Sequence, residues 1–347
     1  MPDVSTILVA VALAVVPSLV YLAVLNAIDR YEKEPWTILL ACIGVGAVVA
    51  PVLSLAILTL LGRPTTLPPA FAPGPAPDAL VGIVECLVLG ALLVGLVHSV
   101  RDEFDDVLDG VIYGAALGAG FGAAESFLYV VGLGTGVTAG AESTQVGIPF
   151  VQLVIAGLNH AFYMAVFGAV LGWAQRLPRG QRWVAIALGL GTATWLNAFH
   201  DTFPVILSRV LSQPDAAIGA VARLLAELIN WLGILTLAVI VTLSWRREAR
   251  ILRTELADEV TAGVVPQADF DTITSSTGRL GRQWTLLRSE GLAPVRRLRR
   301  RYATEGELAF HKYRLTRRHR RLPPAERGDA LRAEIRSLTD PGPEATA

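Results

Sequence analysis

Residues 109–126 have the sequence DGVIYGAALGAGFGAAES, which predicts a tightly packed helix. Glycine recurs in it every four residues, at Gly110, Gly114, Gly118 and Gly122. Residues four apart share one face of a helix, and small residues on that face let a neighbouring backbone approach closely within a membrane. Taken alone, the stripe indicates ordinary helix packing. Glu125 follows on roughly the same face, so we expect its carboxylate to point toward another helix rather than toward lipid.

The composition around this stretch is that of a membrane protein. Of the 347 residues, 53% are hydrophobic and 17% are charged, against about 25% charged in an average soluble domain. The only two cysteines, Cys42 and Cys86, lie inside apolar runs without motif spacing, which excludes a secreted disulfide scaffold. The predicted fold class is therefore all-α, a polytopic transmembrane helix bundle.

Seven stretches before Trp245 approach the roughly 20 apolar residues that a transmembrane helix needs. They are about Val4–Ile28, Trp36–Leu61, Ala79–His98, Val107–Gly132, Gly147–Trp173, Trp183–Phe203 and Ala216–Leu243. The first carries Asp3 before its apolar run and has no basic leader, so we expect an uncleaved helix rather than a signal peptide. The sequence therefore predicts a transmembrane domain over residues 1–245 with about seven spans.

The charges are distributed unevenly along the chain. Lys+Arg and Asp+Glu both number 30, but residues 1–245 hold 9 and 16 of them and carry −7, whereas residues 246–347 hold 21 and 14 and carry +7. Lys and Arg in short loops are retained on the cytoplasmic side. Every second predicted loop lies on the same side of the membrane, and one of these two sets of loops holds most of the Lys and Arg of residues 1–245. This predicts an N-terminus outside and a C-terminus in the cytoplasm.

Residues 246–347 are predicted to form a cytosolic, Arg-rich and partly helical C-terminal tail. Helix-like stretches lie near Arg246–Val260 and Pro324–Leu338, and basic clusters at Arg296–Arg301 and His311–Arg321. Such clusters bind anionic lipid headgroups or nucleic acid. No nucleic-acid motif accompanies them, so nucleic acid is the less favoured partner, and the simplest interpretation is a solvated segment that fixes topology.

Few ionisable side chains fall at bilayer depth, where each costs about 2.5–3.5 kcal/mol and normally marks a site or a pair. Arg223 and Glu227 are four residues apart on one helix, so we interpret them as a structural pair. The others lie on four different predicted helices and fall in the outer half of the bilayer by the predicted orientation: Glu85, Glu125, His160 and His200.

This set of residue types suits two hydrolytic chemistries. A buried glutamate can take a proton from water while an imidazole stabilises the oxyanion. Alternatively, His and Glu bind a divalent metal such as zinc, which lowers the pKa of its bound water to about 7. The chain has no HExxH motif, and the residue types alone are equally compatible with a proton or ion transporter or with a structural polar cluster.

At these residues the chain resembles the PrsW family of intramembrane proteases, distant relatives of the CAAX prenyl endopeptidases and CPBP proteins. The motif DRYEKEP at Asp29–Pro35, the central motif at Glu103–Ser126, the first histidine motif NHAFYMAVFG at Asn159–Gly168 and the stretch around His200 carry the resemblance. It covers about residues 20–245 in order, and the tail lies outside it.

The resemblance implies an intramembrane endopeptidase of a bacterial plasma membrane that cleaves a membrane-anchored, anti-sigma-factor-like regulator near the outer face. It carries a catalytic or site-forming role to Glu125, His160 and His200. Glu85 falls where the family has paired glutamates and a lysine three residues later, but here Cys86 and Leu89 stand in those places. If both glutamates are required, the chain is an inactive relative, a scaffold that binds membrane helices and signals through its tail.

Overall fold

The computed structural model describes residues 4–31, 33–62, 75–100, 104, 106–134, 147–210, 216–275, 278–317 and 325–339. Side chains are described for these residues except at 75–78, 132–134, 147–157, 201, 204–205, 208–210, 216–220, 222–223, 317 and 325. Two arginines of the predicted loops, Arg63 and Arg101, lie outside the described residues, and the side chains of Arg209 and Arg223 are not described.

The chain divides into two compact units, and the division is not sequential. Unit 1 consists of Met1–Ile28 and Glu34–Val239, and unit 2 of Asp29–Lys33 and Ile240–Ala347. The DRYEKEP motif is therefore split, because its first five residues belong to unit 2 whereas Glu34 and Pro35 belong to unit 1.

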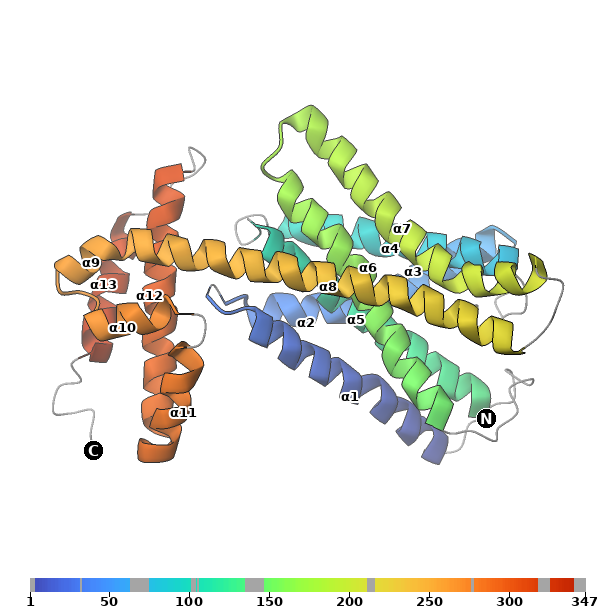
Figure 1. Cartoon of the computed structure of the whole chain (residues 1–347), viewed down its shortest axis with the longest axis horizontal. Coiled ribbons are helices and arrows are strands. Elements are labelled where there is room, and N and C mark those ends of the chain that lie inside the picture. The colour runs from blue at the N-terminus through green and yellow to red at the C-terminus, as the bar shows by residue number, and fades with distance from the viewer. Residues whose placement is uncertain are drawn as a thin grey trace. The chain divides into compact units, whose positions relative to one another are not determined.

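Unit 1 is a bundle of helices, and the described residues contain no strand (Figure 1). Its elements are α1 (Val4–Ile28), α2 (Trp36–Gly44), η1 (Val45–Val49), α3 (Ala50–Leu60), α4 (Pro75–Ser99), α5 (Val107–Gly134), α6 (Gly147–Ala174), α7 (Arg179–Val210) and the first part of α8 (Ala216–Glu255). The all-α prediction is confirmed.

Five segments of the described residues are long and apolar enough to cross a membrane: Val4–Ile28, Trp36–Leu60, Ala79–Ser99, Val107–Val131 and Leu224–Thr261. Leu158–Ala174 in α6 is a shorter apolar helix. Large apolar side chains face outward along the bundle, such as Leu188 on α7 and Leu224 on α8, as expected where the surrounding medium is lipid. The chain is an integral membrane protein, and the number of seven spans stays a prediction.

Glycines let α5 pack closely on two of its sides, against the second candidate span and against α6. On one side, a Cβ at Gly120 would lie 2.2 Å from the carbonyl oxygen of Ile43 on α2, and a Cβ at Gly46 on η1 would lie 2.0 Å from the carbonyl oxygen of Leu117. The second span contains the π-helical turn η1 where this approach occurs, and such turns insert a residue into an α-helix. Only glycine permits backbones this close.

The start of α5 is fixed by reciprocal capping. The Asp106 carboxylate accepts hydrogen bonds from the backbone N–H groups of Leu108 (2.6 Å) and Asp109 (3.3 Å), and the Asp109 carboxylate accepts one from the N–H of Asp106 (2.9 Å). These bonds satisfy donors that the first turn of a helix otherwise leaves open. Further along, Tyr113 donates a hydrogen bond to Glu34, which ties the rest of the DRYEKEP motif to α5.

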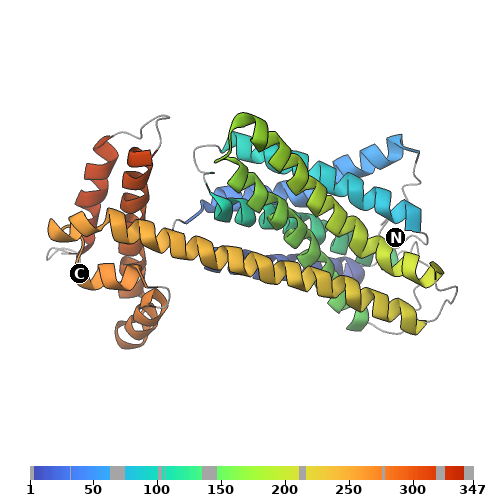
Figure 2. The ribbon, with the colours of Figure 1, turned by 45° about the horizontal axis from the view of Figure 1, so that its top comes forward.

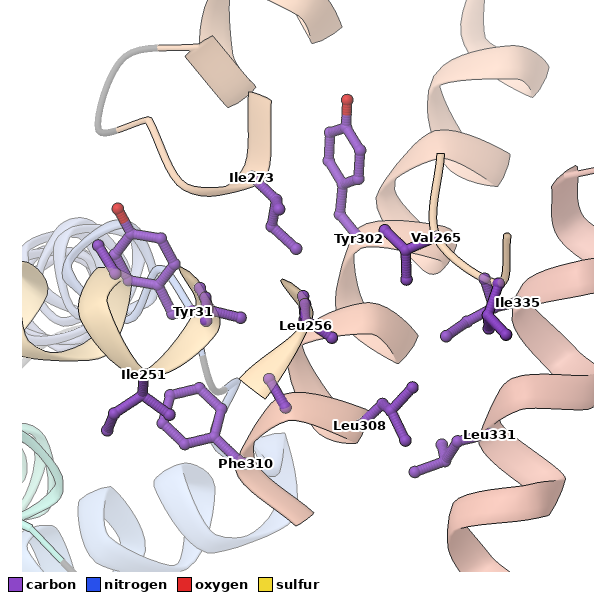
Figure 3. Close-up of a cluster of buried hydrophobic side chains, with 14 of the residues drawn as sticks. Tyr31, Ile251, Leu256, Val265, Ile273, Tyr302, Leu308, Phe310, Leu331 and Ile335 are labelled. Carbon is purple, nitrogen blue, oxygen red and sulfur yellow. The ribbon is translucent and has the colours of Figure 1, made fainter. Parts of the chain in front are cut away.

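Unit 2 is a folded helical unit, so the interpretation of the tail as a solvated segment is wrong. After α8 it contains α9 (Ala257–Thr261), α10 (Gln267–Ile273), α11 (Gly278–Glu290), α12 (Leu292–Arg317) and α13 (Ala325–Thr339). The antiparallel helices α12 and α13 lie side by side (Figure 2). Their apolar faces enclose a core of its own, with Leu256, Ile273, Leu308 and Ile335 fully buried (Figure 3).

The segment Asp29–Lys33 is built into this core, although more than 200 residues of sequence separate it from the rest of unit 2. Tyr31 is 3% exposed within the apolar cluster. The Arg30 guanidinium lies 3.7 Å above the Trp245 ring, and Arg279 donates a hydrogen bond of 2.7 Å to the carbonyl oxygen of Arg30. The link between the first two membrane helices is thus a structural part of unit 2.

Glu305 makes the stability of unit 2 depend on pH. Its side chain on α12 is fully buried, and burial raises the pKa of the carboxyl from 4.5 to about 8, with Asp269 acting in the same direction and Arg301 and Arg279 against it. Between pH 4.5 and 8 the folded state therefore keeps a proton that the unfolded state releases. It follows that unit 2 loses stability as the pH rises through this window.

The free energy of unfolding of unit 2 should fall by up to roughly 1.4 kcal/mol per pH unit in this window. We expect Glu305→Gln to reduce this dependence on pH, because glutamine is neutral at every pH. Hydrogen exchange of the α12 amides in the full-length protein measures this change in stability, after correction for the pH dependence of the exchange reaction itself. Glu307→Gln on the same helix is the control, since that side chain is 39% exposed. Equal slopes for the parent and Glu305→Gln would contradict the assignment.

Candidate active site

The register between α5 and α6 brings the predicted site residues together. The two helices run antiparallel, because Cβ atoms at Gly110, Gly114 and Gly118 would lie 1.9 to 2.1 Å from the carbonyl oxygens of Gly168, Met164 and His160, in that order. Three of the four glycines of the stripe are therefore points of backbone contact with α6. His160 lies at the level of Gly118, about two turns from Glu125 along α5.

The direction of helical side chains closes this gap. Each Cα–Cβ bond tilts toward the N-terminus of its own helix, so side chains from antiparallel neighbours lean toward one another. His160 Nε2 lies 2.9 Å from Glu125 Oε2, and the exposed fractions of the two side chains are 8% and 16%. This buried carboxylate–imidazole pair, the Glu125–His160 pair, agrees with the prediction that Glu125 points toward another helix.

Aromatic rings surround the His160 imidazole. The Phe121 ring lies edge-on with its centroid 4.8 Å away, and the Tyr163 ring lies perpendicular at 6.1 Å. Asn230 on α8 donates a hydrogen bond of 3.1 Å to the hydroxyl of Tyr163. Apolar ring edges lower the local polarity, which strengthens the electrostatic interaction within the Glu125–His160 pair.

His200 on α7 takes part in a second pair. Its Nε2 lies 2.8 Å from Glu227 Oε1 on α8 and 3.3 Å from Asn159 Nδ2 on α6. One ring nitrogen carries either a proton or a lone pair, so it can donate to Glu227 or accept from Asn159, but not both at once. Transfer of a proton between His200 and Glu227 therefore changes which hydrogen bond the imidazole makes.

Asn159 connects the two pairs through the chain itself. It is the residue before His160, and consecutive residues point about 100° apart around a helix. His160 thus reaches α5 while Asn159 reaches α7. Four helices, α5 to α8, contribute to one polar region within unit 1.

Glu85, the fourth predicted site residue, lies half-buried on α4. The adjacent Cys86 is fully buried, and Asn197 Nδ2 lies 3.4 Å from its sulfur and 3.2 Å from the carbonyl oxygen of Gly82. Asn197 precedes His200 by about one turn of α7, so α4 packs against the helix that carries the second imidazole. The catalytic role of Glu85 stays a prediction.

Sequence reasoning missed two residues of this region. It paired Glu227 with Arg223 because they are four residues apart, but Glu227 contacts His200 from another helix. The signal for Glu227 was His200, which has no carboxylate one turn away on its own helix segment and so needed a partner on another helix. The signal for Asn159 was its position, because it is an amide side chain directly before the candidate residue His160 in an apolar helix.

For a reaction that uses His200, we expect Glu227→Gln to lower the rate by about 10- to 100-fold, the range found when a partner that orients a metal-binding histidine is removed. The remaining amide cannot hold the charge that stabilises a protonated His200. Rates of substrate cleavage by the purified variants measure this effect. Arg223→Gln is the matched control: if Glu227 served only to neutralise Arg223, both substitutions would cost the same, which would contradict the role assigned to Glu227.

A bundle of apolar helices that contains carboxylate–imidazole pairs has the residue types that hydrolysis of a bond inside the bilayer requires. The sequence pattern of the PrsW family intramembrane metalloproteases matches residues 34–254. The chain belongs to the PrsW family, which is a family of intramembrane proteases. No curated protein and no solved structure matches the chain.

The metal that the family description implies can be compared with the side chains present. Imidazole nitrogens and carboxylate oxygens, the donor types of both pairs, are ordinary zinc ligands. Among the described residues, however, no group of three or more His, Cys, Asp or Glu side chains lies close enough to hold one metal ion. The donor types fit a metal, but their arrangement as two pairs does not form one coordination sphere.

Proposed function

We propose that the chain is an endopeptidase that hydrolyses a peptide bond of a membrane-anchored regulatory protein, of the anti-sigma-factor type, near the outer face of the membrane. Glu125, His160, His200 and Glu85 form its catalytic set. The observation that carries the proposal is the buried contact of 2.9 Å between His160 Nε2 and Glu125 Oε2. Ionisable groups within a membrane bundle are costly, so they are kept mainly where they pair with one another or serve a function.

In this proposal Glu125 is the general base. Its carboxylate takes a proton from the attacking water. The His160 imidazole, protonated at the start, delivers its proton to the leaving amine and regains one from Glu125 across their 2.9 Å contact. His200, oriented by Glu227 through Nε2, donates its Nδ1–H toward the oxyanion that forms on the scissile carbonyl. The Asn159 side-chain amide lies 3.3 Å from His200 Nε2 and adds a second donor in this region.

A divalent metal such as zinc, if the protein holds one, would supply Lewis-acid activation of water or of the scissile carbonyl. Metal analysis of the purified protein, with cleavage measured after chelation and after metal is restored, tests this part of the proposal. Loss of activity on chelation with recovery on zinc supports a zinc enzyme, and unchanged activity in a metal-free preparation supports glutamate-type hydrolysis.

The membrane orientation is part of the proposal, with the N-terminus outside and unit 2 in the cytoplasm. The excess of Lys and Arg after Trp245 supports it. Protease digestion of sealed membrane vesicles of known sidedness checks the orientation through the accessibility of unit 2.

A non-enzymatic scaffold is the second candidate, and the folded core of unit 2 is the observation that favours it. The two candidates are separated by mapping new protein N-termini in membranes that contain the parent chain or Glu125→Gln. An enzyme loses specific cleavages in Glu125→Gln. A scaffold leaves the cleavage pattern unchanged and loses function only when the core of unit 2 is disrupted, for example by Leu308→Asp.

A further inference from the structure

Helix α11 exposes apolar side chains on its outer face. None of its 13 residues is buried, and Leu280 and Trp284 are 63% and 57% exposed. These two residues are four apart and therefore share one face of the helix. Leu292, at the start of α12, is 62% exposed as well. Such side chains are unusual on a helix that faces only water.

Arginines accompany these apolar side chains. Residues 278–300 contain seven Arg and a single acidic residue, Glu290, with no Lys or Asp. The Arg288 guanidinium lies 4.8 Å from the centre of the Trp284 ring. None of Arg288, Arg296 and Arg297 forms an ion pair with a described residue.

Some cations elsewhere in unit 2 are neutralised by carboxylates of the same unit. Lys312 lies 3.1 Å from Glu259 and Arg332 lies 2.7 Å from the same carboxylate, which lowers the pKa of Glu259. Arg327 pairs with Glu307. Among the described residues, Arg288, Arg296 and Arg297 thus carry positive charge without a carboxylate partner beside the exposed apolar groups, whereas other such arginines, for example Arg250 and Arg336, lie away from them in the sequence.

We propose that the α11 face, formed by Leu280, Trp284, Arg288, Leu292 and Arg296, is a docking surface for an anionic lipid bilayer. Trp and Leu side chains enter the boundary between headgroups and acyl chains, while arginines contact anionic headgroups. A nucleic acid would complement the arginines but leave Leu280, Trp284 and Leu292 in water. The combination of apolar and cationic groups therefore favours a lipid surface.

This docking surface is separate from the proposed catalytic set, so its test does not depend on cleavage. The full-length protein is reconstituted into vesicles that contain brominated phosphatidylcholine, either alone or with phosphatidylglycerol. Bromine on the acyl chains quenches tryptophan only at the bilayer, and the difference between the parent and Trp284→Phe isolates the signal of Trp284 from that of the other tryptophans.

We expect Trp284 to be quenched in vesicles with phosphatidylglycerol and to recover at high salt, which screens the headgroup charge. Substituting Arg288, Arg296 and Arg297 by Gln together is expected to weaken docking by about 100-fold, since each arginine near an anionic surface contributes roughly fivefold. The control replaces Arg250, Arg327 and Arg336 by Gln, which removes the same charge from other exposed positions and is expected to leave quenching unchanged.

Three results would overturn the proposal. One is a Trp284 signal that is the same with and without phosphatidylglycerol. Another is a signal that follows the ratio of protein to lipid, which would indicate a second copy of the chain on this face. The third is protection of α11 from hydrogen exchange by a mixed-sequence oligonucleotide but not by anionic vesicles.

Discussion

Replacing Glu125 by Gln is expected to lower the rate of peptide cleavage by about 10²- to 10⁴-fold, the contribution of a positioned general base. The substitution keeps the size of the side chain and a hydrogen-bonding group 2.9 Å from His160 Nε2, but an amide cannot accept a proton from water. Initial rates of cleavage of a membrane-anchored substrate in reconstituted vesicles measure the effect.

Two further variants control this experiment. Glu307→Gln makes the same chemical change on the exposed surface of unit 2 and should cleave at the parent rate. Glu85→Gln tests the second predicted carboxylate, and a comparable loss supports its place in the catalytic set. A Glu125→Gln protein that cleaves as fast as the parent would show that another group is the base.

The second large effect is expected at Gly114. A Cβ at this position would lie 2.1 Å from the carbonyl oxygen of Met164, so Gly114→Ala forces α5 and α6 apart. Overpacking of this kind costs about 1–3 kcal/mol, and more where backbone rather than a side chain must move. Because a displacement of about 1 Å at a reacting pair can cost 10²-fold in rate, cleavage should fall together with stability.

Gly95→Ala on α4 is the matched control, since no described atom lies within 4 Å of a Cβ at that position. Alanine is a better helix former than glycine by about 1 kcal/mol, so this variant should be as stable as the parent or more so. Thermal unfolding in detergent compares the three proteins. Equal melting temperatures for Gly114→Ala and Gly95→Ala would contradict the close backbone contact.

The sequence was sufficient to predict the packing of α5 because its cause is local. Glycines spaced by four residues lie on one helix face whatever the partner helix is, and three of them do contact α6. The same periodicity directed Glu125 toward a neighbouring helix, and His160 was the imidazole available on the next one. The composition likewise predicts a helical membrane protein without knowledge of any contact.

The features that sequence reasoning missed depend on contacts between distant parts of the chain. Glu227 had a suitable partner one turn away, and only the contact of 2.8 Å between α7 and α8 side chains shows that it faces His200. The core of unit 2 includes Tyr31, which no periodicity of residues 246–347 could reveal. Its helices α11, α12 and α13 are rich in arginine, so their narrow apolar faces were hidden within a strongly charged composition.

The most direct test of the proposed hydrolytic centre is a double-mutant cycle on Glu125 and His160. Cleavage is measured for the parent, Glu125→Gln, His160→Asn and the double variant under the same conditions. If the two side chains act as one unit, the double variant loses about as much rate as either single variant, because removing one member already disables the pair. Losses that multiply in the double variant, or single variants that cleave at the parent rate, would contradict a shared role.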